Sequence, residues 1–289
     1  MQSDKAMKKI LVPTDFSDNA YRAAEYAARM GVEQQYNLHI LHCYTATSSS
    51  FSASECNESE KESMTLKADI TMKELLEKLQ KEFPNLLISY SNERGLLEEV
   101  IPQEAAKKDY AVIVMGTTGS SANKNVFWGS NTAQIIAKTS IPVIAIPEDS
   151  ASMKSNKIGL LTNFQAEELI TLQEFMQVFN TQIDLDLIHI YGENDNLETV
   201  KDKLNAWSFN IRKFNNIQKI GYVMSPVVKS QSDLDSIPEV ITQLVDKANI
   251  DMILVSKSRK SFFKRLFGSS VSKAMALDLH KPAFFSKTH

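Results

Sequence analysis

Short apolar segments that alternate with helical patterns constrain this chain more than any other feature. The clearest, residues 110–116 (YAVIVMG), has the length and composition of a strand buried on both faces of a sheet. Similar segments lie at residues 8–16, 38–44, 86–92 and 141–147, with helical patterns between them. Because strands that alternate with helices form right-handed βαβ units, this order predicts a parallel α/β sheet covered on both faces.

The helix expected after the first strand has clear boundary signals. Ser17 or Asp18 can cap its start, and Gly31 is predicted to end it. Residues 45–63 are rich in serine and glutamate and predict a solvated loop before a helix at residues 64–83. One face of the first helix carries only small residues that suit close packing on a sheet: Ala20, Ala23, Ala24, Ala27 and Ala28.

The pattern of the first half starts again after a short polar linker at residues 149–156. Residues 157–164 (KIGLLTNF) repeat the opening segment, and residues 184–191 (DLDLIHIY) repeat the second strand. The paired landmarks, in the same order in both halves, are His42 with His189, Tyr44 with Tyr191, Gly129 with Gly268, Ser130 with Ser269 and Pro142 with Pro282. The repeat predicts two similar α/β domains in tandem, residues 1–150 and residues 155–289.

Composition excludes several classes of protein. The chain has 289 residues, enough for about two domains, with 43% hydrophobic and 23% charged residues and a net charge of −3. This balance lacks the positive excess typical of proteins that bind nucleic acid or anionic membranes. No apolar run reaches the roughly 18 residues of a membrane span, and the start lacks the apolar core of a signal peptide. The two cysteines, Cys43 and Cys56, lack the spacing of a zinc site, so we expect a cytoplasmic protein.

A glycine-bearing segment between a strand and a helix can hold phosphate. Gly116 and Gly119 follow the buried strand, and Gly129 and Ser130 stand where the next helix is expected to begin. Glycine lets the backbone approach a ligand closely, and the N–H groups at a helix start attract anions. Asp15, at the end of the first strand, can accept hydrogen bonds from ribose hydroxyls. The spacing alone also fits a plain turn, and neither GxGxxG nor GxxxxGK[ST] is present.

The spacing G-x2-G-x9-G-S after a hydrophobic strand resembles the ATP-binding signature of the universal stress protein family. The opening KKILVPTDFS and the segment LHILHCY also resemble the first two strands of that family. The resemblance covers about residues 7–147 and extends more weakly over the second half, as in tandem members. It implies two tandem, open, parallel five-stranded sheets with helices on both faces, a Rossmann-like fold.

The resemblance also implies an ATP site in the first domain, with Mg²⁺ or Mn²⁺ held mainly by phosphate oxygens. The residues implied to contact the adenosine part are Pro13, Thr14, Asp15, Leu38, Met115 and Gly116. Those implied to hold the phosphates are Thr118, Gly119, Gly129, Ser130, Asn131 and Thr132. Within these sets, Asp15 would bond the ribose, Leu38 would reach adenine through its main chain, and Thr118 stands at a position that varies in the family.

The second half departs from this signature. Asn163 replaces the acidic residue, and Ser256 and Arg259 replace the first two glycines. The Cβ of Ser256 and the long side chain of Arg259 should obstruct the approach of phosphate to the backbone. The sequence therefore predicts a degenerate, empty second site.

These observations lead to an ATP-binding, cytoplasmic stress-response protein that acts as a regulatory module with nucleotide in its first domain. No general base other than Asp15 stands near the motif, so we expect at most slow hydrolysis. Two alternatives remain open: a nucleotide-processing enzyme of related fold, and a nucleotide-free adaptor. The implied partners are an adenine nucleotide and a protein not identified by the sequence, without nucleic acid or membrane.

The two halves are expected to form an intramolecular pseudo-dimer, because residues 141–147 and 281–287 are apolar edge strands that would otherwise be open to aggregation. Association of two chains into a homodimer is a further possibility. His42 and His189 are interpreted as packed strand histidines and Trp128 as a packing anchor. Cys56 can be interpreted either as a redox-reactive thiol or as an incidental one. Residues 257–265 contain five basic residues and can be either a solvated loop or a site for an anion or a protein partner.

Overall fold

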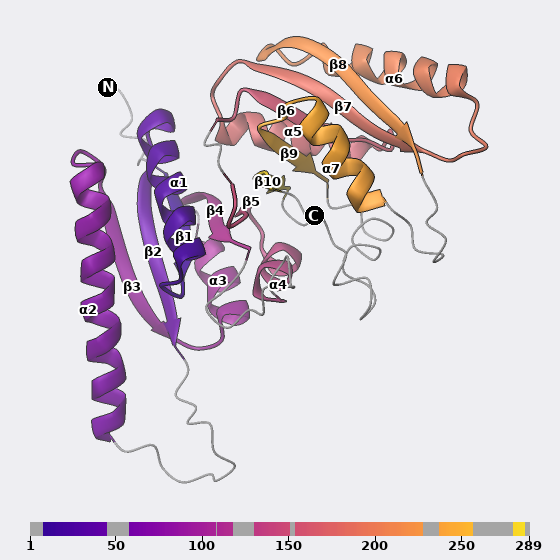
Figure 1. The fold of residues 1–289 in the computed structure, drawn as a ribbon. Helices are drawn as coiled ribbons and strands as arrows, with labels where there is room; N and C mark the ends of the chain where they lie inside the picture. The colour runs from indigo at the N-terminus through magenta and orange to yellow at the C-terminus, as the bar shows by residue number, and fades with distance from the viewer. Residues whose placement is uncertain are drawn as a thin grey trace, which may run out of the picture.

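The computed structural model describes residues 8–44, 58–107, 109–117, 130–150, 154–227, 237–256 and 280–286. Strands and helices alternate through both halves of the chain (Figure 1). The elements of the first half are β1 (Lys9–Thr14), α1 (Asp18–Gln34), β2 (Asn37–Tyr44), α2 (Glu58–Glu82), β3 (Ile88–Arg94), α3 (Leu97–Ala105), β4 (Tyr110–Gly116), α4 (Ser130–Lys138) and β5 (Val143–Ile146). Those of the second half are β6 (Lys157–Leu161), α5 (Ala166–Val178), β7 (Ile183–Tyr191), α6 (Leu197–Ile211), β8 (Ile217–Pro226), α7 (Ile237–Lys247), β9 (Met252–Val255) and β10 (Ala283–Phe285).

All described strands belong to one ten-stranded sheet in the order β3-β2-β1-β4-β5-β10-β9-β6-β7-β8. Each half contributes five strands. Counted inward from either edge, equivalent strands of the two halves follow in the same order, as a twofold axis between β5 and β10 would produce. The strands within each half pair in parallel, and direction reverses only where β10 meets β5. The two predicted parallel sheets are therefore present, and they are joined edge to edge.

The junction confirms that the two halves meet through their last strands, and it shows that these strands run antiparallel. Ala283 pairs with Ala145, Phe284 with Ile144 and Phe285 with Val143. Each short apolar strand thereby covers an edge that would be open in either half alone. A second contact between the halves joins the end of α1 to the end of α5, where the Asn180 N–H donates to Gln34 Oε1 at 2.9 Å.

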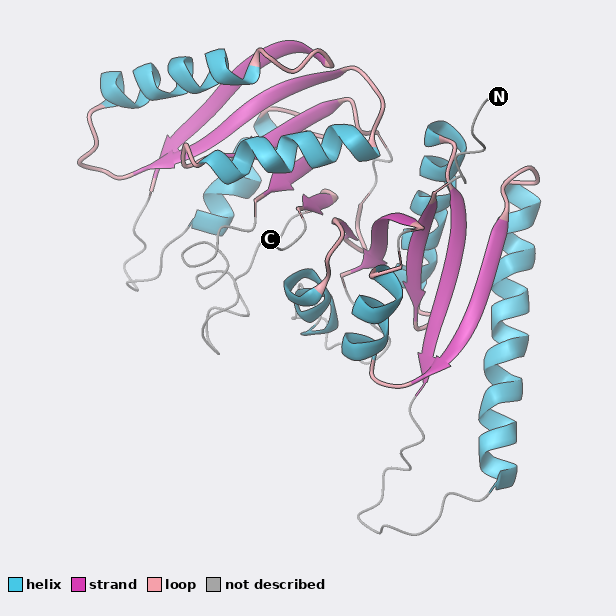
Figure 2. Ribbon diagram, turned by 180° about the vertical axis from the view of Figure 1, so that it is seen from behind, coloured by secondary structure: helices cyan, strands magenta, loops and turns pink. Residues whose placement is uncertain are grey.

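Helices cover both faces of the sheet (Figure 2). Residues of α1, α2, α5 and α6 belong to one buried apolar cluster, and residues of α3, α4 and α7 belong to the other. Each cluster contains residues of both halves, so the joined sheet has one core on each face. No helix in the described part of the chain has the length and apolar character needed to cross a membrane.

Helix α1 confirms most of its sequence prediction. Ser17 is the N-cap and accepts a hydrogen bond from the Ala20 N–H, and the alanine face is buried. The predicted end at Gly31 is wrong, because the helix continues to Gln34 and closes on Gln35 in the left-handed conformation. Gly31 instead permits close packing, since a Cβ there would lie 2.8 Å from Leu38 Cδ1.

The boundary of α2 also differs from the prediction. The helix begins at Glu58, whereas residues 58–63 were expected to lie in the polar loop. That stretch, ESEKES, is polar but rich in helix-forming glutamate and lysine, and acidic residues favour the start of a helix. Low hydrophobicity was therefore a misleading signal for its backbone conformation.

Candidate functional site

The carboxyl ends of β1 and β4 form the centre of the candidate site. The two strands pair in parallel, so Thr14 and Gly116 end at the same edge of the sheet. Asp15 follows Thr14 with an exposed side chain, and its Oδ1 accepts a hydrogen bond from the Ser17 N–H at 3.1 Å. This is the edge at which open α/β sheets bind ligands, so the predicted position of Asp15 is consistent with ligand contact.

The backbone at the end of β4 is held by side chains of two helices. The amide of Asn19 in α1 donates to the Ile146 carbonyl at 3.1 Å, and the Thr117 N–H donates to the same oxygen at 3.1 Å. Thr132 in α4 donates its hydroxyl proton to the Gly116 carbonyl at 2.9 Å. The start of the glycine-bearing segment is therefore fixed to β5, α1 and α4.

Two residues of this network have roles that differ from the sequence interpretation. The hydroxyl proton of Thr132 is donated to Gly116 inside the protein rather than toward a ligand. A Cβ at residue 116 would lie 2.4 Å from Asn19 Oδ1, so the packing of α1 already requires glycine there. Asn19, which is buried in the structure, was not identified from the sequence. Its signal in the sequence is its position directly before Ala20, the first residue of the alanine face of α1.

His42 braces the turn after β1 from the neighbouring strand. Its Nδ1 contacts the Thr14 carbonyl oxygen at 2.9 Å, and its ring lies 4.4 Å from that of Phe16, centroid to centroid. Phe16 has a positive φ of 62° and donates its N–H to Thr14 Oγ1 at 3.0 Å. The interpretation of His42 as a packed strand histidine is confirmed, and its contacts hold the turn that presents Asp15.

The second half repeats this brace. His189 Nδ1 contacts the Thr162 carbonyl oxygen at 2.8 Å, and its ring lies 4.7 Å from that of Phe164. Phe164 also has a positive φ, 63°, and donates its N–H to Thr162 Oγ1. The brace is thus a property of the repeated fold, and a difference in ligand binding between the halves has to come from other residues.

Glu168 is one such difference. Its carboxylate is buried at the end of β6 and accepts hydrogen bonds from the N–H groups of Asn163 and Gln165 and from the Thr162 hydroxyl. Burial raises the pKa of this carboxyl, and these hydrogen bonds oppose the rise. The corresponding position in α1 is Ala20, so among the described residues only the second half has a buried carboxylate on this turn. In the first half the Ser17 N–H, the equivalent of the Gln165 N–H, donates to the exposed Asp15 instead.

Leu38 is not brought to the carboxyl edge, and its predicted contact with adenine is wrong. Leu38 pairs with Ile10, four residues before Thr14, which places it roughly 13 Å from the edge at about 3.3 Å per residue. Its N–H donates to the Leu87 carbonyl, and its own carbonyl accepts from Ser89. The resemblance had assigned this role to the wrong end of β2.

Cys43 lies near the carboxyl end of β2, where Leu38 had been expected to act. Burial, and then the charge of Glu93, raise the pKa of its thiol to about 11, so the thiol stays protonated near neutral pH. Cys43 is half-buried and packs against the core on the α3 side. The interpretation of Cys43 as a small packing residue is therefore confirmed.

The remaining predicted site residues divide into two groups. Pro13 and Met115 are buried strand residues at the candidate edge, and Asn131 is exposed in the first turn of α4. The residues of the sequence analysis that lie outside the described part of the chain are Thr118, Gly119, Gly129, the side chain of Ser130, Cys56, Trp128, Arg259, Gly268, Ser269 and the basic run at 257–265. Among the described residues, no three His, Cys, Asp or Glu side chains gather as metal ligands.

Comparison with known proteins agrees with this fold. Residues 7–147 match the model of the universal stress protein family. Universal stress protein MJ0531 of Methanocaldococcus jannaschii is 29% identical over 142 residues, which are 48% of this chain and 81% of that protein. A five-stranded parallel α/β unit thus defines the class of the first half, and residues 7–147 are a domain of the universal stress protein family.

Solved structures extend the similarity of fold over both halves. A universal stress protein from Archaeoglobus fulgidus superimposes with a TM-score of 0.67 at 16% identity, over 96% of this chain and 96% of that one. A putative universal stress protein from Pseudomonas aeruginosa gives a TM-score of 0.58 at 13% identity, over 98% of this chain and 94% of that one. The ten-stranded arrangement is therefore similar to known folds along nearly the whole chain.

Proposed function

We propose that this chain is a cytoplasmic stress-response protein that binds ATP at the carboxyl edge of its first half. Residues 1–150 and 155–289 are then tandem domains of the universal stress protein family, and only the first holds nucleotide. The observation that carries the proposal is the coincidence of the glycine spacing with the edge formed by β1, β4 and α4.

The flanks of the glycine-bearing segment suit a nucleotide. Asp15 presents an exposed carboxylate that can accept hydrogen bonds from ribose hydroxyls. Helix α4 begins at Ser130, and the first N–H groups of a helix lack internal acceptors and attract anions. Phosphates held there would supply most of the ligands for a divalent ion.

The second half supports binding in one domain only. Asn163 stands where the first half has Asp15, and Ser256 stands where the first half has Gly116. Glu168 additionally places a buried carboxylate on the turn after β6, where it accepts from Asn163 and Gln165. A second anion close to this carboxylate would be repelled.

Regulation rather than rapid turnover suits this site. Asp15 is the one acidic side chain that follows β1 directly, and contact with ribose would engage it. A general base must reach the water it activates, and an Asp15 carboxylate engaged by ribose would not be available for that role. We therefore propose a module whose nucleotide-bound form acts on a protein partner, with hydrolysis at most slow.

Isothermal titration with ATP tests the proposal on the intact chain, and we expect a stoichiometry near one. Gly129→Val should abolish the binding heat, because a β-branched side chain removes the close approach of phosphate. Gly268→Val, the equivalent change in the second half, is the matched control and should leave affinity unchanged. A stoichiometry of two, or equal effects of the two variants, would contradict binding in the first half only.

The nucleotide-free adaptor makes a different prediction. Protein purified without added nucleotide and then denatured should release an adenine nucleotide that mass spectrometry identifies. No released nucleotide, together with no heat on titration, would favour the adaptor. Release of a chemically altered nucleotide after incubation with ATP would favour the enzyme of related fold.

A further inference from the structure

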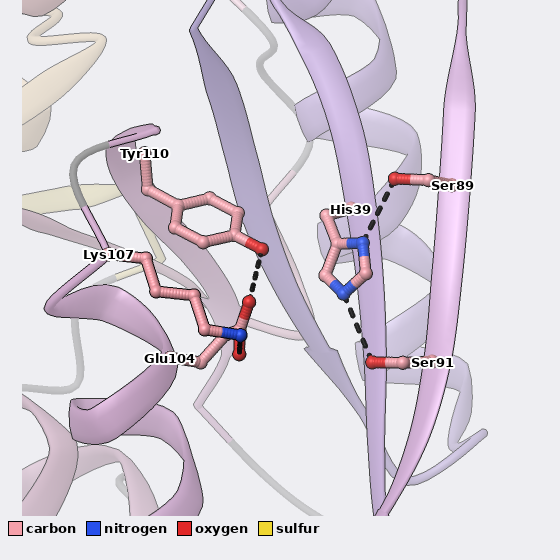
Figure 3. Close-up of polar contacts among 6 residues, drawn as sticks. All are labelled: His39, Ser89, Ser91, Glu104, Lys107 and Tyr110. Atoms are coloured by element: carbon pink, nitrogen blue, oxygen red, sulfur yellow. Dashed lines mark hydrogen bonds and ion pairs between the residues drawn. The ribbon is translucent and has the colours of Figure 1, made fainter.

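A polar cluster lies on the α3 side of the first half, away from the carboxyl edge. Figure 3 shows His39 of β2 between two serines of β3 on one side and a group from α3, the turn after it and β4 on the other. His39 Nδ1 lies 2.9 Å from Ser89 Oγ, and Nε2 lies 3.1 Å from Ser91 Oγ. The group on the other side consists of Glu104, Lys107 and Tyr110.

The hydrogen bonds assign the protons of the His39 imidazole. Ser89 Oγ donates to the Leu38 carbonyl at 3.1 Å, which uses the single proton of that hydroxyl. Ser89 therefore accepts from His39 Nδ1, and a neutral imidazole then has an acceptor at Nε2. Ser91 donates its hydroxyl proton to that nitrogen, which is the arrangement of a nucleophile and its general base.

The surroundings keep His39 neutral near pH 7. Burial is the largest influence and lowers its pKa below the ordinary value of 6.5. Lys9 and Lys107 act in the same direction, and Glu104 and Glu93 act in the opposite direction without reversing the shift. A neutral imidazole is the form that can accept a proton from Ser91.

Glu104 is placed to favour the imidazolium that such a transfer would produce. It accepts hydrogen bonds from Tyr110 at 2.7 Å and from Lys107 at 2.5 Å. Burial acts to raise the pKa of Glu104, but these hydrogen bonds outweigh it and the pKa is lowered. Glu104 therefore stays ionised, and its charge stabilises positive charge on His39.

The second half shows that the fold does not require this cluster. The register of β2 with β3 aligns His39 with Ser89, and the equivalent register of β7 with β8 aligns Asp186 with Gly221. The position of Ser91 corresponds to Val223. The same sheet positions thus fold without an imidazole and without either hydroxyl, so packing alone does not account for the arrangement.

We propose that Ser91 is a nucleophilic serine, activated by His39, that accepts an acyl group from small activated esters. Ser91 Oγ would bond to the acyl carbon as its proton moves to His39 Nε2. The bond between that carbon and the ester oxygen would break, and the leaving alcohol would take the proton from the imidazolium. Ser91 is half-buried, so a small ester can reach it while the imidazole stays partly shielded.

Acylation of the intact chain by para-nitrophenyl acetate tests the proposal. We expect one equivalent of nitrophenolate to be released, and peptide mass spectrometry should locate one acetyl group on Ser91. Ser91→Ala should lose this label, and His39→Gln should slow labelling roughly 100-fold, the lower end of a typical general-base contribution. Thermal melting of each variant checks that the fold is retained.

Two controls separate activation from exposure. Ser208→Ala removes another partly buried serine, one that bonds the Leu204 carbonyl instead of a histidine, and should leave the labelling rate unchanged. The rate of the native chain should be flat above pH 6.5 and fall below it, as His39 becomes protonated. An acetyl group found only on lysines, or an unchanged rate in a folded His39→Gln variant, would overturn the proposal.

Discussion

Asn19 occupies the space beside Gly116: a Cβ at residue 116 would lie 2.4 Å from Asn19 Oδ1 and 2.8 Å from Asn19 Cγ. The pair joins the first turns of α1 to the end of β4, where the glycine-bearing segment begins. In the second half the corresponding residues are Glu167 and Ser256, so asparagine and glycine are replaced together. This agrees with a steric dependence of each residue on the other.

Gly116→Ala should destabilise the protein by about 1–3 kcal/mol, because the added methyl group overlaps the buried Asn19 side chain. Asn19→Ala removes the obstruction, so the double variant should recover part of the loss in a double-mutant cycle. Urea denaturation followed by circular dichroism measures the free energies of unfolding of the native chain and the three variants. Strict additivity of the two changes would contradict the steric coupling.

Asp15→Asn should weaken ATP binding modestly, since an amide can still hydrogen-bond ribose but carries no charge. The turn should survive, because the amide oxygen can still accept the Ser17 N–H that Asp15 Oδ1 accepts. Titration calorimetry gives the affinity, with Asn163→Asp in the second half as the matched control. If Asn163→Asp created a second binding event, Glu168 and Ser256 would not be what closes that half.

Phe284→Ala should destabilise the joined sheet by about 3–5 kcal/mol, as expected for removal of a fully buried aromatic ring. Phe284 pairs with Ile144 across the junction, and its ring meets that of Phe175 edge-on at 5.5 Å. Phe209→Ala is the control, because Phe209 is 68% exposed and should change stability by less than about 0.5 kcal/mol. Similar losses in the two variants would show that the β5–β10 junction contributes little.

His189 should make stability fall as the pH falls. Burial lowers its pKa below 6.5 in the folded chain, so the unfolded chain binds more protons just below that pH. The contribution is complete above pH 6.5 and decreases toward the lower pKa of the folded state. His189→Asn, whose amide can replace the bond to the Thr162 carbonyl, should flatten this part of the profile. Parallel profiles for both proteins from pH 5 to 7 would contradict the assignment.

The sequence predicted the repeated α/β pattern, the alanine face of α1 and the pairing of the two last strands. These features follow from local signals, since apolar runs, helical periodicity and an exposed apolar edge are each visible within a short stretch of chain. The sequence predicted only that His42 and His189 are packed strand histidines. The structure added that each ring contacts a carbonyl at the end of the neighbouring strand, that of Thr14 for His42 and that of Thr162 for His189.

Tertiary structure decided which side chains meet. The register of β1 with β2 placed Leu38 beside Ile10 rather than at the carboxyl edge. The packing of α1 on β4 brought Asn19 against Gly116, and the register of β2 with β3 placed His39 between two serines. The packing of the whole sheet decides which strands are neighbours and in which register they pair. A shift of one residue in the register of β2 would turn Leu38 and His39 to the other face of the sheet. Spacing along the chain carries no such information, so the sequence by itself determined the elements, and only the folded sheet determined the contacts between them.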